Sequence, residues 1–213
     1  MSTPCGVYEL RQYTSHPGRR DELIGLFDTH LVEPQEDVGM HVVGQFRDVH
    51  RPDRFVWLRG FPDMAARLDG LTRFYLDSDA WARHRGAVNA TMIDSDDVLL
   101  LRPEPVTPDL CSRLVPRPRP GDAPQPARVY AIDIHHVGGS VDEPDLAAPG
   151  GEVVAVLRTE PAPNNFPQLP IRADAEVLVV ISRFETHRDV PPPSACDAEE
   201  RLVLEPTTRS ALR

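Results

Sequence analysis

The order of strand-like and helix-like segments in the first half limits this chain to few folds. Residues 6–14 alternate as a strand does, and residues 16–31 carry apolar residues at helical spacing. Residues 41–50 and 54–61 then form a hairpin pattern, two further helical patterns follow, and residues 96–103 close the half as a strand. The order β-α-β-β-α-β predicts a ferredoxin-like arrangement, an antiparallel sheet with helices on one face.

The second half repeats these strand patterns in weaker form. VYAIDIHHVGG at residues 129–139 is similar to VYELRQYTSHPG at residues 7–18, and three later strand patterns also correspond. The segments that correspond to the helices are short and rich in glycine and proline, so we expect the helices of this half to be degenerate. The fold class is therefore α+β: two fused ferredoxin-like repeats whose four-stranded sheets pack into an eight-stranded barrel.

A proline-rich stretch separates the halves and predicts a domain boundary. It cannot sustain a helix or a central strand. We expect an N-terminal domain at residues 1–104, a linker at residues 105–126 and a C-terminal domain at residues 127–213.

Composition excludes several classes of function. The net charge of -10 and the isoelectric point near 5.2 argue against nucleic acid or an anionic membrane as partner, because both require a basic face. No signal peptide pattern and no apolar run of roughly 20 residues is present, so we expect a cytoplasmic protein. All 23 basic residues are arginine, which excludes a lysine Schiff base and a P-loop. Cys5, Cys111 and Cys196 are odd in number and far apart, which predicts free thiols.

Alternation places Glu9, Arg11 and Tyr13 on one face of the first strand. We expect this face to meet an equally polar face of the second half, giving a cavity for an oxygenated, anionic small molecule, with arginines as oxyanion partners. The alternative is a buried salt-bridge network in which Glu9 and Asp133 pair with the arginines. The other candidate contacts of the small molecule on strands are Gln45, Arg47, Trp57, Arg59 and Asp133.

Two histidines are candidates for acid–base chemistry. His84 follows Trp81 by one helical turn, and His135 belongs to the first strand pattern of the second half. The alternative is that each is a solvated or capping histidine. The histidine and cysteine spacings match no known metal motif, so the sequence predicts neither a metal nor a cofactor.

The stretch RTEPAPNNFPQLPIR, residues 158–172, interrupts two apolar strand patterns with a long proline-stiffened loop. Asn164 and Phe166 lie at its expected tip, and as a lid the loop would bring both to the ligand. Alternatively, the loop is a structural clasp whose phenylalanine docks on the other half, since proline reduces the entropy lost on docking. The sequence favours the clasp slightly.

Several segments resemble the NIPSNAP family. They are VYELRQYTSHPGRRDELIGLF, DRFVWLRGFPDMAARL and DSDAW in the first half, and the loop at 158–172 with PTTRSALR in the second, where they look like the second repeat of tandem bacterial members. The resemblance covers most of the chain except the linker. It implies the dimeric α+β barrel superfamily, whose members include cofactor-independent monooxygenases, polyketide cyclases, lactone isomerases and haem-using enzymes. Fold alone does not choose among these activities.

The leading hypothesis is a cofactor-independent tailoring enzyme of bacterial secondary metabolism. It would use acid–base residues for cyclisation, isomerisation or elimination on a polyketide-like or aromatic small molecule. The alternatives are a non-catalytic small-molecule-binding or scaffold protein and a cofactor-free monooxygenase. The expected partner is a small-molecule substrate, with neither nucleic acid nor membrane, and homodimer formation is left open.

Overall fold

The protein forms a closed barrel with helices on one side. The structure is a computed structural model that describes residues 4–105, 109–123, 128–137, 150–192 and 198–213. The strands are β1 (Val7–Ser15), β2 (His41–Asp48), β3 (Arg54–Phe61), β4 (Met92–Pro103), β5 (Val129–His136), β6 (Glu152–Thr159), β7 (Val177–Phe184) and β8 (Glu200–Pro206). The helices are α1 (Arg20–His30), α2 (Val32–Glu36), α3 (Met64–Tyr75) and α4 (Asp79–Asn89), with 3-10 turns η1 (Leu110–Arg113) and η2 (His187–Asp189).

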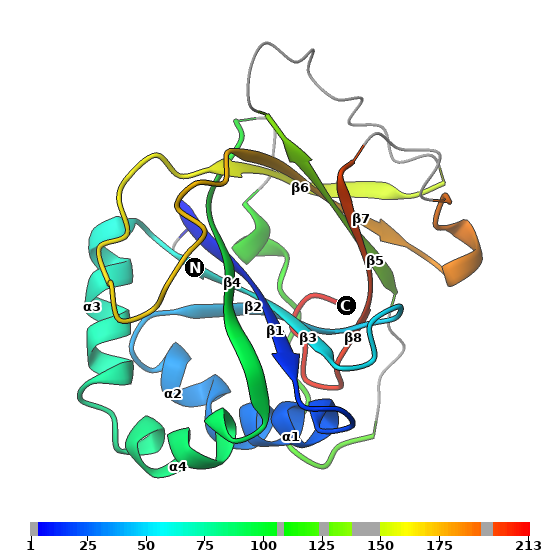
Figure 1. Ribbon diagram of the computed structural model, residues 1–213. Helices are drawn as coiled ribbons and strands as arrows, with labels where there is room; N and C mark the ends of the chain where they lie inside the picture. The colour runs from blue at the N-terminus through cyan, green and yellow to red at the C-terminus, as the bar shows by residue number, and fades with distance from the viewer. Residues whose placement is uncertain (1–3, 106–108, 124–127, 138–149, 193–197) are drawn as a thin grey trace.

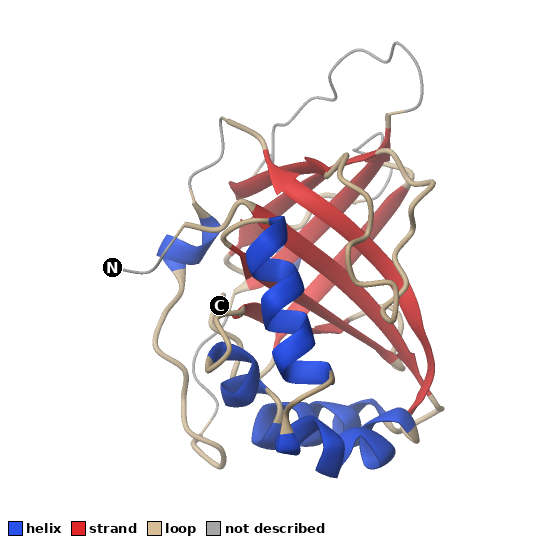
Figure 2. Ribbon diagram, turned by 90° about the vertical axis from the view of Figure 1, so that its left-hand side faces the viewer, coloured by secondary structure: helices blue, strands red, loops and turns tan. Residues whose placement is uncertain are grey.

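The barrel joins the strands in the order β1-β3-β2-β8-β5-β7-β6-β4, and neighbouring strands are antiparallel. Each half contributes four consecutive strands, and the halves meet where β2 pairs with β8 and β4 pairs with β6. Helices α1–α4 cover the outer face of the first-half strands (Figures 1 and 2). The expected eight-stranded barrel is therefore present. The domain boundaries at 104 and 127 stay a prediction, because strands of both halves build this one barrel.

Local sequence signals account for the two helices after β3. The Asp63 side chain accepts a hydrogen bond from the Ala66 amide at the start of α3, and Ser78 accepts one from the Trp81 amide at the start of α4. The sequence did not predict α2, and α1 begins at Arg20 rather than at Pro17. Gly18, at φ +77, turns the chain between β1 and α1.

The middle of the barrel interior is apolar, and polar contacts such as that of Arg54 with Glu200 lie toward one end of it, which corrects the expected polar surface between the halves. Tyr8 and Leu10 of β1 face the barrel interior, where they belong to one apolar cluster with residues from each of the remaining strands. Glu9 and Arg11 point the other way, into the layer between the sheet and its helices. Asp133 alternates with the inward-facing Ile132 and Ile134, so it lies on the outer side of β5. The two polar strand faces therefore lie outside the barrel and do not meet.

The prediction of free thiols was wrong for two of the three cysteines. Cys5 and Cys111 form a disulfide, with their Cα atoms 6.1 Å apart across a sequence separation of 106 residues. The Asp109 carboxylate accepts hydrogen bonds from the amides of both cysteines. A Cβ on Gly60 would lie 2.7 Å from the Cys5 sulfur, so the glycine leaves room for the bridge. The spacing of the cysteines gives no sign of this pair, because only the fold brings Cys5, just before β1, next to Cys111 in η1. Cys196 lies outside the described residues.

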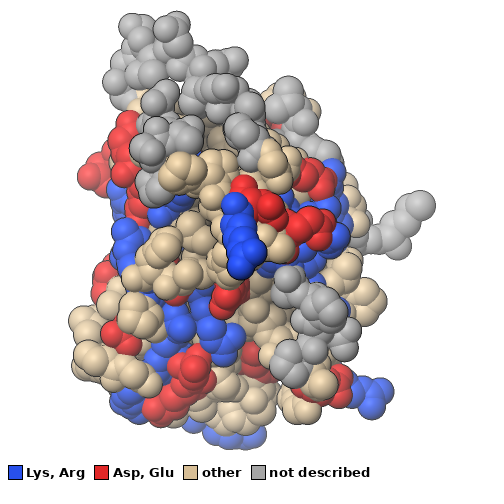
Figure 3. Space-filling model, turned by 90° about the vertical axis from the view of Figure 1, so that its right-hand side faces the viewer, with Lys and Arg blue, Asp and Glu red and all other residues tan. Residues whose placement is uncertain are grey.

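The molecular surface mixes charges of both signs. On the face shown in Figure 3, basic and acidic side chains lie beside one another rather than in separate fields. Ion pairs such as Arg183 with Glu152 and Arg113 with Glu152 contribute to this mixing. No helix in the described part of the chain is long and apolar enough to cross a membrane. Cytoplasmic location stays a prediction.

The disulfide predicts how many cysteines react with an alkylating reagent. Alkylation of the denatured protein without reductant should label only Cys196, and prior reduction should expose all three cysteines to the reagent. Replacing Cys5 and Cys111 together by alanine should lower the free energy of unfolding by about 2–5 kcal/mol, as for other native disulfides. Mass spectrometry and urea unfolding measure the two effects. Three labelled cysteines without reductant would contradict the bridge.

Candidate functional site

A single buried carboxylate organises the layer between the first-half sheet and its helices. Glu9 Oε2 accepts hydrogen bonds from Arg11 Nη1 at 2.7 Å and from Arg59 Nε at 2.8 Å, and Glu9 Oε1 accepts one from Arg67 Nε at 2.7 Å. All four side chains are at most 1% exposed. The group forms an arginine cluster: Arg11, Arg59 and Arg67 around Glu9.

Strand register and helix spacing place these residues together. In the antiparallel pair of β1 and β3, Glu9 lies opposite Arg59 and Arg11 lies opposite Trp57. Arg67 comes from α3, where it shares the buried face with Leu71 and Phe74 at helical spacing. The cluster therefore ties α3 to the sheet through charge in addition to apolar packing.

The arginine cluster carries an excess of positive charge. Three guanidinium groups share one carboxylate, which leaves two positive charges without a counter-charge among the described residues. Burial opposes ionisation of Glu9, but the three arginines hold the pKa of its carboxyl far below the usual range. Burial lowers the pKa of Arg67. Buried unbalanced charge is costly, so this layer favours an additional anion.

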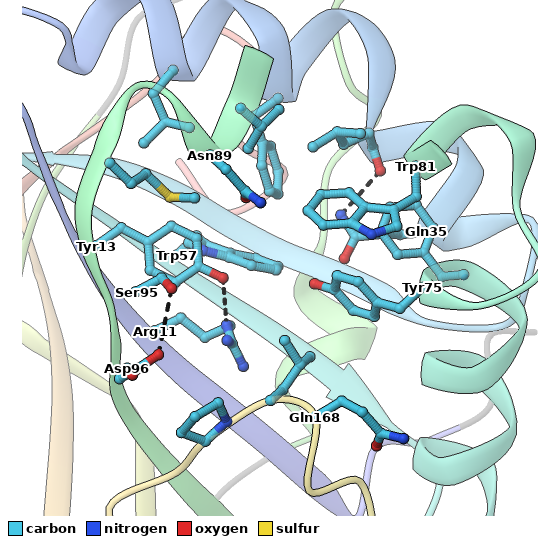
Figure 4. Close-up of a pocket in the computed structure, with 18 of the residues that line it drawn as sticks. Arg11, Tyr13, Gln35, Trp57, Tyr75, Trp81, Asn89, Ser95, Asp96 and Gln168 are labelled. Carbon is cyan, nitrogen blue, oxygen red and sulfur yellow. Dashed lines mark hydrogen bonds between the residues drawn. The ribbon is translucent and has the colours of Figure 1, made fainter. Parts of the chain in front are cut away.

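A cavity of about 320 Å³ opens beside the arginine cluster. Its floor is the outer face of β1 and β3, and its walls come from the helices, the start of β4 and the loop between β6 and β7 (Figure 4). The apolar lining residues are Leu23, Phe27, Leu31, Phe74, Leu76, Val88, Met92, Phe166, Leu169 and Pro170. The polar or aromatic ones are Arg11, Tyr13, Gln35, Trp57, Tyr75, Trp81, Asn89, Ser95, Asp96 and Gln168.

The deep polar groups of this cavity are hydrogen-bond donors. Arg11 Nε donates to the Tyr13 hydroxyl at 2.8 Å, and Arg59 Nη1 donates to the Tyr75 hydroxyl at 3.3 Å. Neither hydroxyl proton has an acceptor among the described residues, and the buried indole N–H of Trp57 also lacks one. Figure 4 shows Arg11, Tyr13 and Tyr75 directing their polar ends toward the same part of the cavity.

Trp57 lies between two guanidinium groups at the floor of the cavity. The Arg59 guanidinium carbon is 5.1 Å from the ring centroid and that of Arg11 is 5.6 Å from it. Tyr13 and Phe27 make edge contacts with the same ring. Cation–π and aromatic contacts fix the indole, so the cavity floor is preorganised before any ligand enters.

The loop at residues 160–176 closes one side of the cavity from the second half of the chain (Figure 1). Arg67 Nη1 donates to the side-chain oxygens of both Asn164 and Asn165. Phe166 is 3% exposed and packs near Tyr75, with ring centroids 6.2 Å apart. The loop thus docks on the other half as the clasp interpretation expected, and the same phenylalanine lines the cavity. The candidate site is built by both halves.

The structure brings together part of the set of residues chosen from sequence. Arg11, Tyr13, Trp57 and Phe166 line the cavity. Three other predicted residues, Glu9, Arg59 and Asn164, lie next to the cavity lining. Glu9 accepts hydrogen bonds from Arg11 and Arg59, and Asn164 accepts one from Arg67.

Gln45, Arg47 and Asp133 lie away from the cavity. Gln45 donates to Asp28 at 2.8 Å, and burial raises the pKa of that carboxyl to about 6. Arg47 pairs with Asp21 near the surface, and Asp133 pairs with Arg201 in the second half. Asp133 is in an ion pair, but with Arg201 of its own half rather than with an arginine of the first half as the salt-bridge alternative expected.

Both candidate histidines also lie outside the cavity lining. The His84 ring stacks on His30 of α1 with centroids 3.9 Å apart, and desolvation and His30 lower its pKa. His135 belongs to β5 and lies on the outer side of the second-half sheet. Their position offers no support for an acid–base role in this cavity.

Sequence reasoning missed Arg67, Tyr75 and Gln35. A signal was present for Arg67, because it precedes Leu71 by four residues and therefore lies on the apolar face of its helix. An arginine on an apolar face needs a buried partner, which is Glu9 here. Tyr75 and Gln35 gave no such signal, because their positions at the cavity follow from how α2 and α3 cross the sheet.

One group of described residues has the composition of a metal site. The ligand atoms of Cys5, Asp109 and Cys111 lie within 4.8 Å of one another. Two of them are the bonded sulfurs of the disulfide. A metal would need the thiolates, so these residues hold the bridge in this structure and not an ion.

The first half of the chain is similar to proteins of one family. Residues 8–108 match the model of the NIPSNAP family, and no curated protein sequence matches the chain. A NIPSNAP family protein from Agrobacterium tumefaciens is 16% identical, with a TM-score of 0.44 over 48% of this chain and 96% of that one. A NIPSNAP-like domain protein from Burkholderia xenovorans is 21% identical, with a TM-score of 0.44 over 48% of this chain and 88% of that one.

A structure related over both halves is described as a putative monooxygenase from Lactobacillus acidophilus. It covers 95% of this chain and 93% of its own, with 13% identity and a TM-score of 0.51. At that identity the likeness shows the fold alone. Its description as a monooxygenase therefore carries no argument about the chemistry of this cavity.

The carboxylate of Glu9 predicts that one isosteric substitution strongly destabilises the protein. Glu9→Gln removes the only counter-charge of the arginine cluster among the described residues and should lower the free energy of unfolding by about 3–5 kcal/mol. Urea unfolding measures the loss. Glu22→Gln, which removes an exposed partner of Arg19, is the matched control and should leave stability unchanged.

The same pair of variants tests the pH dependence. Because the folded pKa of Glu9 is depressed, its stabilisation is complete above the ordinary value of 4.5 and is lost as pH falls below it. The parent protein should therefore lose stability in acid more steeply than Glu9→Gln. Equal slopes for the two proteins below that pH would contradict the depressed pKa.

Proposed function

We propose that this protein, whose residues 8–108 are a NIPSNAP domain, binds a small organic anion with an aromatic body in the cavity beside Arg11. The observation that carries the proposal is the unbalanced charge of the arginine cluster, which borders an aromatic cavity whose deep polar groups are donors. Charge-assisted hydrogen bonds to an anionic oxygen would offset the cost of burying that charge.

The dimensions and lining of the cavity suit a ligand of one or two rings. Its volume of about 320 Å³ lies at the lower end of ordinary small-molecule pockets. Phe27, Trp57, Tyr75 and Trp81 offer ring faces and edges for stacking. Asn89, Asp96 and Gln168 are exposed at the rim, where a polar substituent of the ligand would meet water.

We also propose that the fold consists of two fused repeats. The first-half strands run in the order β4-β1-β3-β2, and the second-half strands run in the equivalent order β8-β5-β7-β6. This correspondence supports a degenerate second repeat. The second repeat then keeps the barrel closed and supplies the loop at 160–176 to the cavity of the first.

Cofactor-independent catalysis on the bound anion is the second candidate function. The donors at Arg11, Tyr13 and Tyr75 favour it, because they would stabilise negative charge that develops on a substrate oxygen during cyclisation, isomerisation or elimination. A base within the cavity has weaker support. Asp96 is the carboxylate of the lining and is exposed at the rim. Simple binding needs no such base, which is why binding is the leading proposal.

Calorimetry with matched probes tests the anion site. We expect 2-naphthoate to bind and the neutral 2-naphthamide of the same shape to bind about ten- to hundredfold more weakly, because the amide lacks the charge-assisted contact to Arg11. Arg11→Met keeps the stem and removes the charge, and it should reduce 2-naphthoate affinity by a similar factor. Melting temperature should rise with 2-naphthoate concentration in the parent protein.

Arg73→Met is the matched control for this experiment. Arg73 lies on α3 like Arg67 but is exposed and pairs only with Asp69. This variant should bind 2-naphthoate as the parent does. Equal affinity of the carboxylate and the amide, or unchanged affinity in Arg11→Met, would rule out the anion site.

A further inference from the structure

We propose that the cavity binds enols and phenols as their anions, so that the ligand loses its hydroxyl proton to water on entering. This inference rests on the proposed organic-anion site and narrows its ligands to weak oxygen acids that are largely neutral in solution. The juxtaposition that carries it is a set of unused donors around Arg11, beside acceptors that each already take a hydrogen bond from an arginine.

The inventory of hydrogen-bonding groups decides which form of the ligand fits. The Tyr13 hydroxyl, the Tyr75 hydroxyl and the Trp57 indole N–H lack acceptors among the described residues. The one deep side-chain amide oxygen, that of Gln35, already accepts from Arg59 at 3.2 Å. A neutral phenol would have to donate to an oxygen that already accepts from an arginine, whereas a phenolate oxygen accepts from the unused donors without donating.

The arginines fix the direction of these donors. Arg11 Nε occupies one lone pair of the Tyr13 oxygen, and Arg59 Nη1 occupies one of the Tyr75 oxygen. Each hydroxyl proton must then point away from its arginine. Figure 4 shows both hydroxyls directed into the cavity, where a ligand oxygen would meet them.

The electrostatics act in the same direction. The arginine cluster holds two uncompensated positive charges in a layer sheltered from water, and these favour the ionised form of an acid whose oxygen also accepts from the unused donors, which the Tyr13 oxygen does not. Tyr13 does not compete as the anion, because burial raises its pKa and keeps its hydroxyl protonated as a donor. The bound ligand is therefore the group that ionises.

The step is an acid dissociation and balances without a further reactant. The O–H bond of the ligand breaks, its electron pair stays on the ligand oxygen, and the proton passes to water or buffer. No residue of the chain changes its protonation state, and nothing is oxidised or reduced. An enol held in this way is an enolate, which is the form that reacts at carbon with electrophiles.

Absorption spectroscopy with 4-nitrophenol tests the inference, because its phenolate is yellow and its neutral form is colourless. At a pH where the free phenol is largely neutral, the wild-type protein should turn the bound probe yellow, equivalent to at least a tenfold shift of its ionisation. Calorimetry in buffers of different ionisation heat should show about one proton released for each probe bound.

Two variants locate the effect. Tyr13→Phe should reduce the ionised fraction of bound 4-nitrophenol, with about ten- to hundredfold loss of affinity for the phenolate. Tyr130→Phe removes the hydroxyl of a tyrosine buried inside the barrel, away from the cavity, and should behave as the parent does. If Tyr13→Phe fails to fold, the spectrum of the probe on the wild-type protein still decides the question.

The outcomes separate this inference from the proposed function. Binding of 2-naphthoate together with colourless, proton-retaining binding of 4-nitrophenol would overturn the inference and leave the anion site standing. Failure of both probes to bind would overturn both. Yellow bound probe with unchanged behaviour in Tyr13→Phe would contradict the assigned role of Tyr13.

Discussion

The sharing of one carboxylate by three buried arginines is the interaction on which the cavity depends. Glu9 holds Arg11 and Arg59 on the sheet and Arg67 on α3, so the helix cannot move without breaking an ion pair. Arg11 and Arg59 in turn orient Tyr13 and Tyr75 and enclose the ring of Trp57. Such a network is expensive in desolvation, and buried ion pairs often contribute little to stability. The network also creates a preorganised positive site beside the cavity.

The second half completes this site with its strands and one loop. Its strands pair with β2 and β4 and close the barrel, which fills the interior with apolar side chains and leaves no edge for other strands. Its loop at 160–176 reaches across to Arg67 through Asn164 and Asn165 and places Phe166 at the cavity wall. Prolines in this loop reduce the entropy that docking costs.

Much of the fold could be predicted from local patterns. Alternation in β1 correctly grouped Glu9, Arg11 and Tyr13 on one face, and the two helical patterns after residue 61 correspond to α3 and α4. The prediction failed where distant segments had to be paired. Cys5 and Cys111 carry no spacing signal for a disulfide, and the polar face of β1 meets helices rather than the second half.

The sequence by itself determined the order of the strands and of helices α1, α3 and α4, and the polar face of the first strand. These properties are local, because side-chain direction alternates with each residue along a strand. Only the tertiary structure decided that this face lies under α1–α4, that Arg67 joins the cluster and that Phe166 completes the cavity. Which face of a strand becomes the barrel interior depends on closure with the other half, and that is a property of the whole chain.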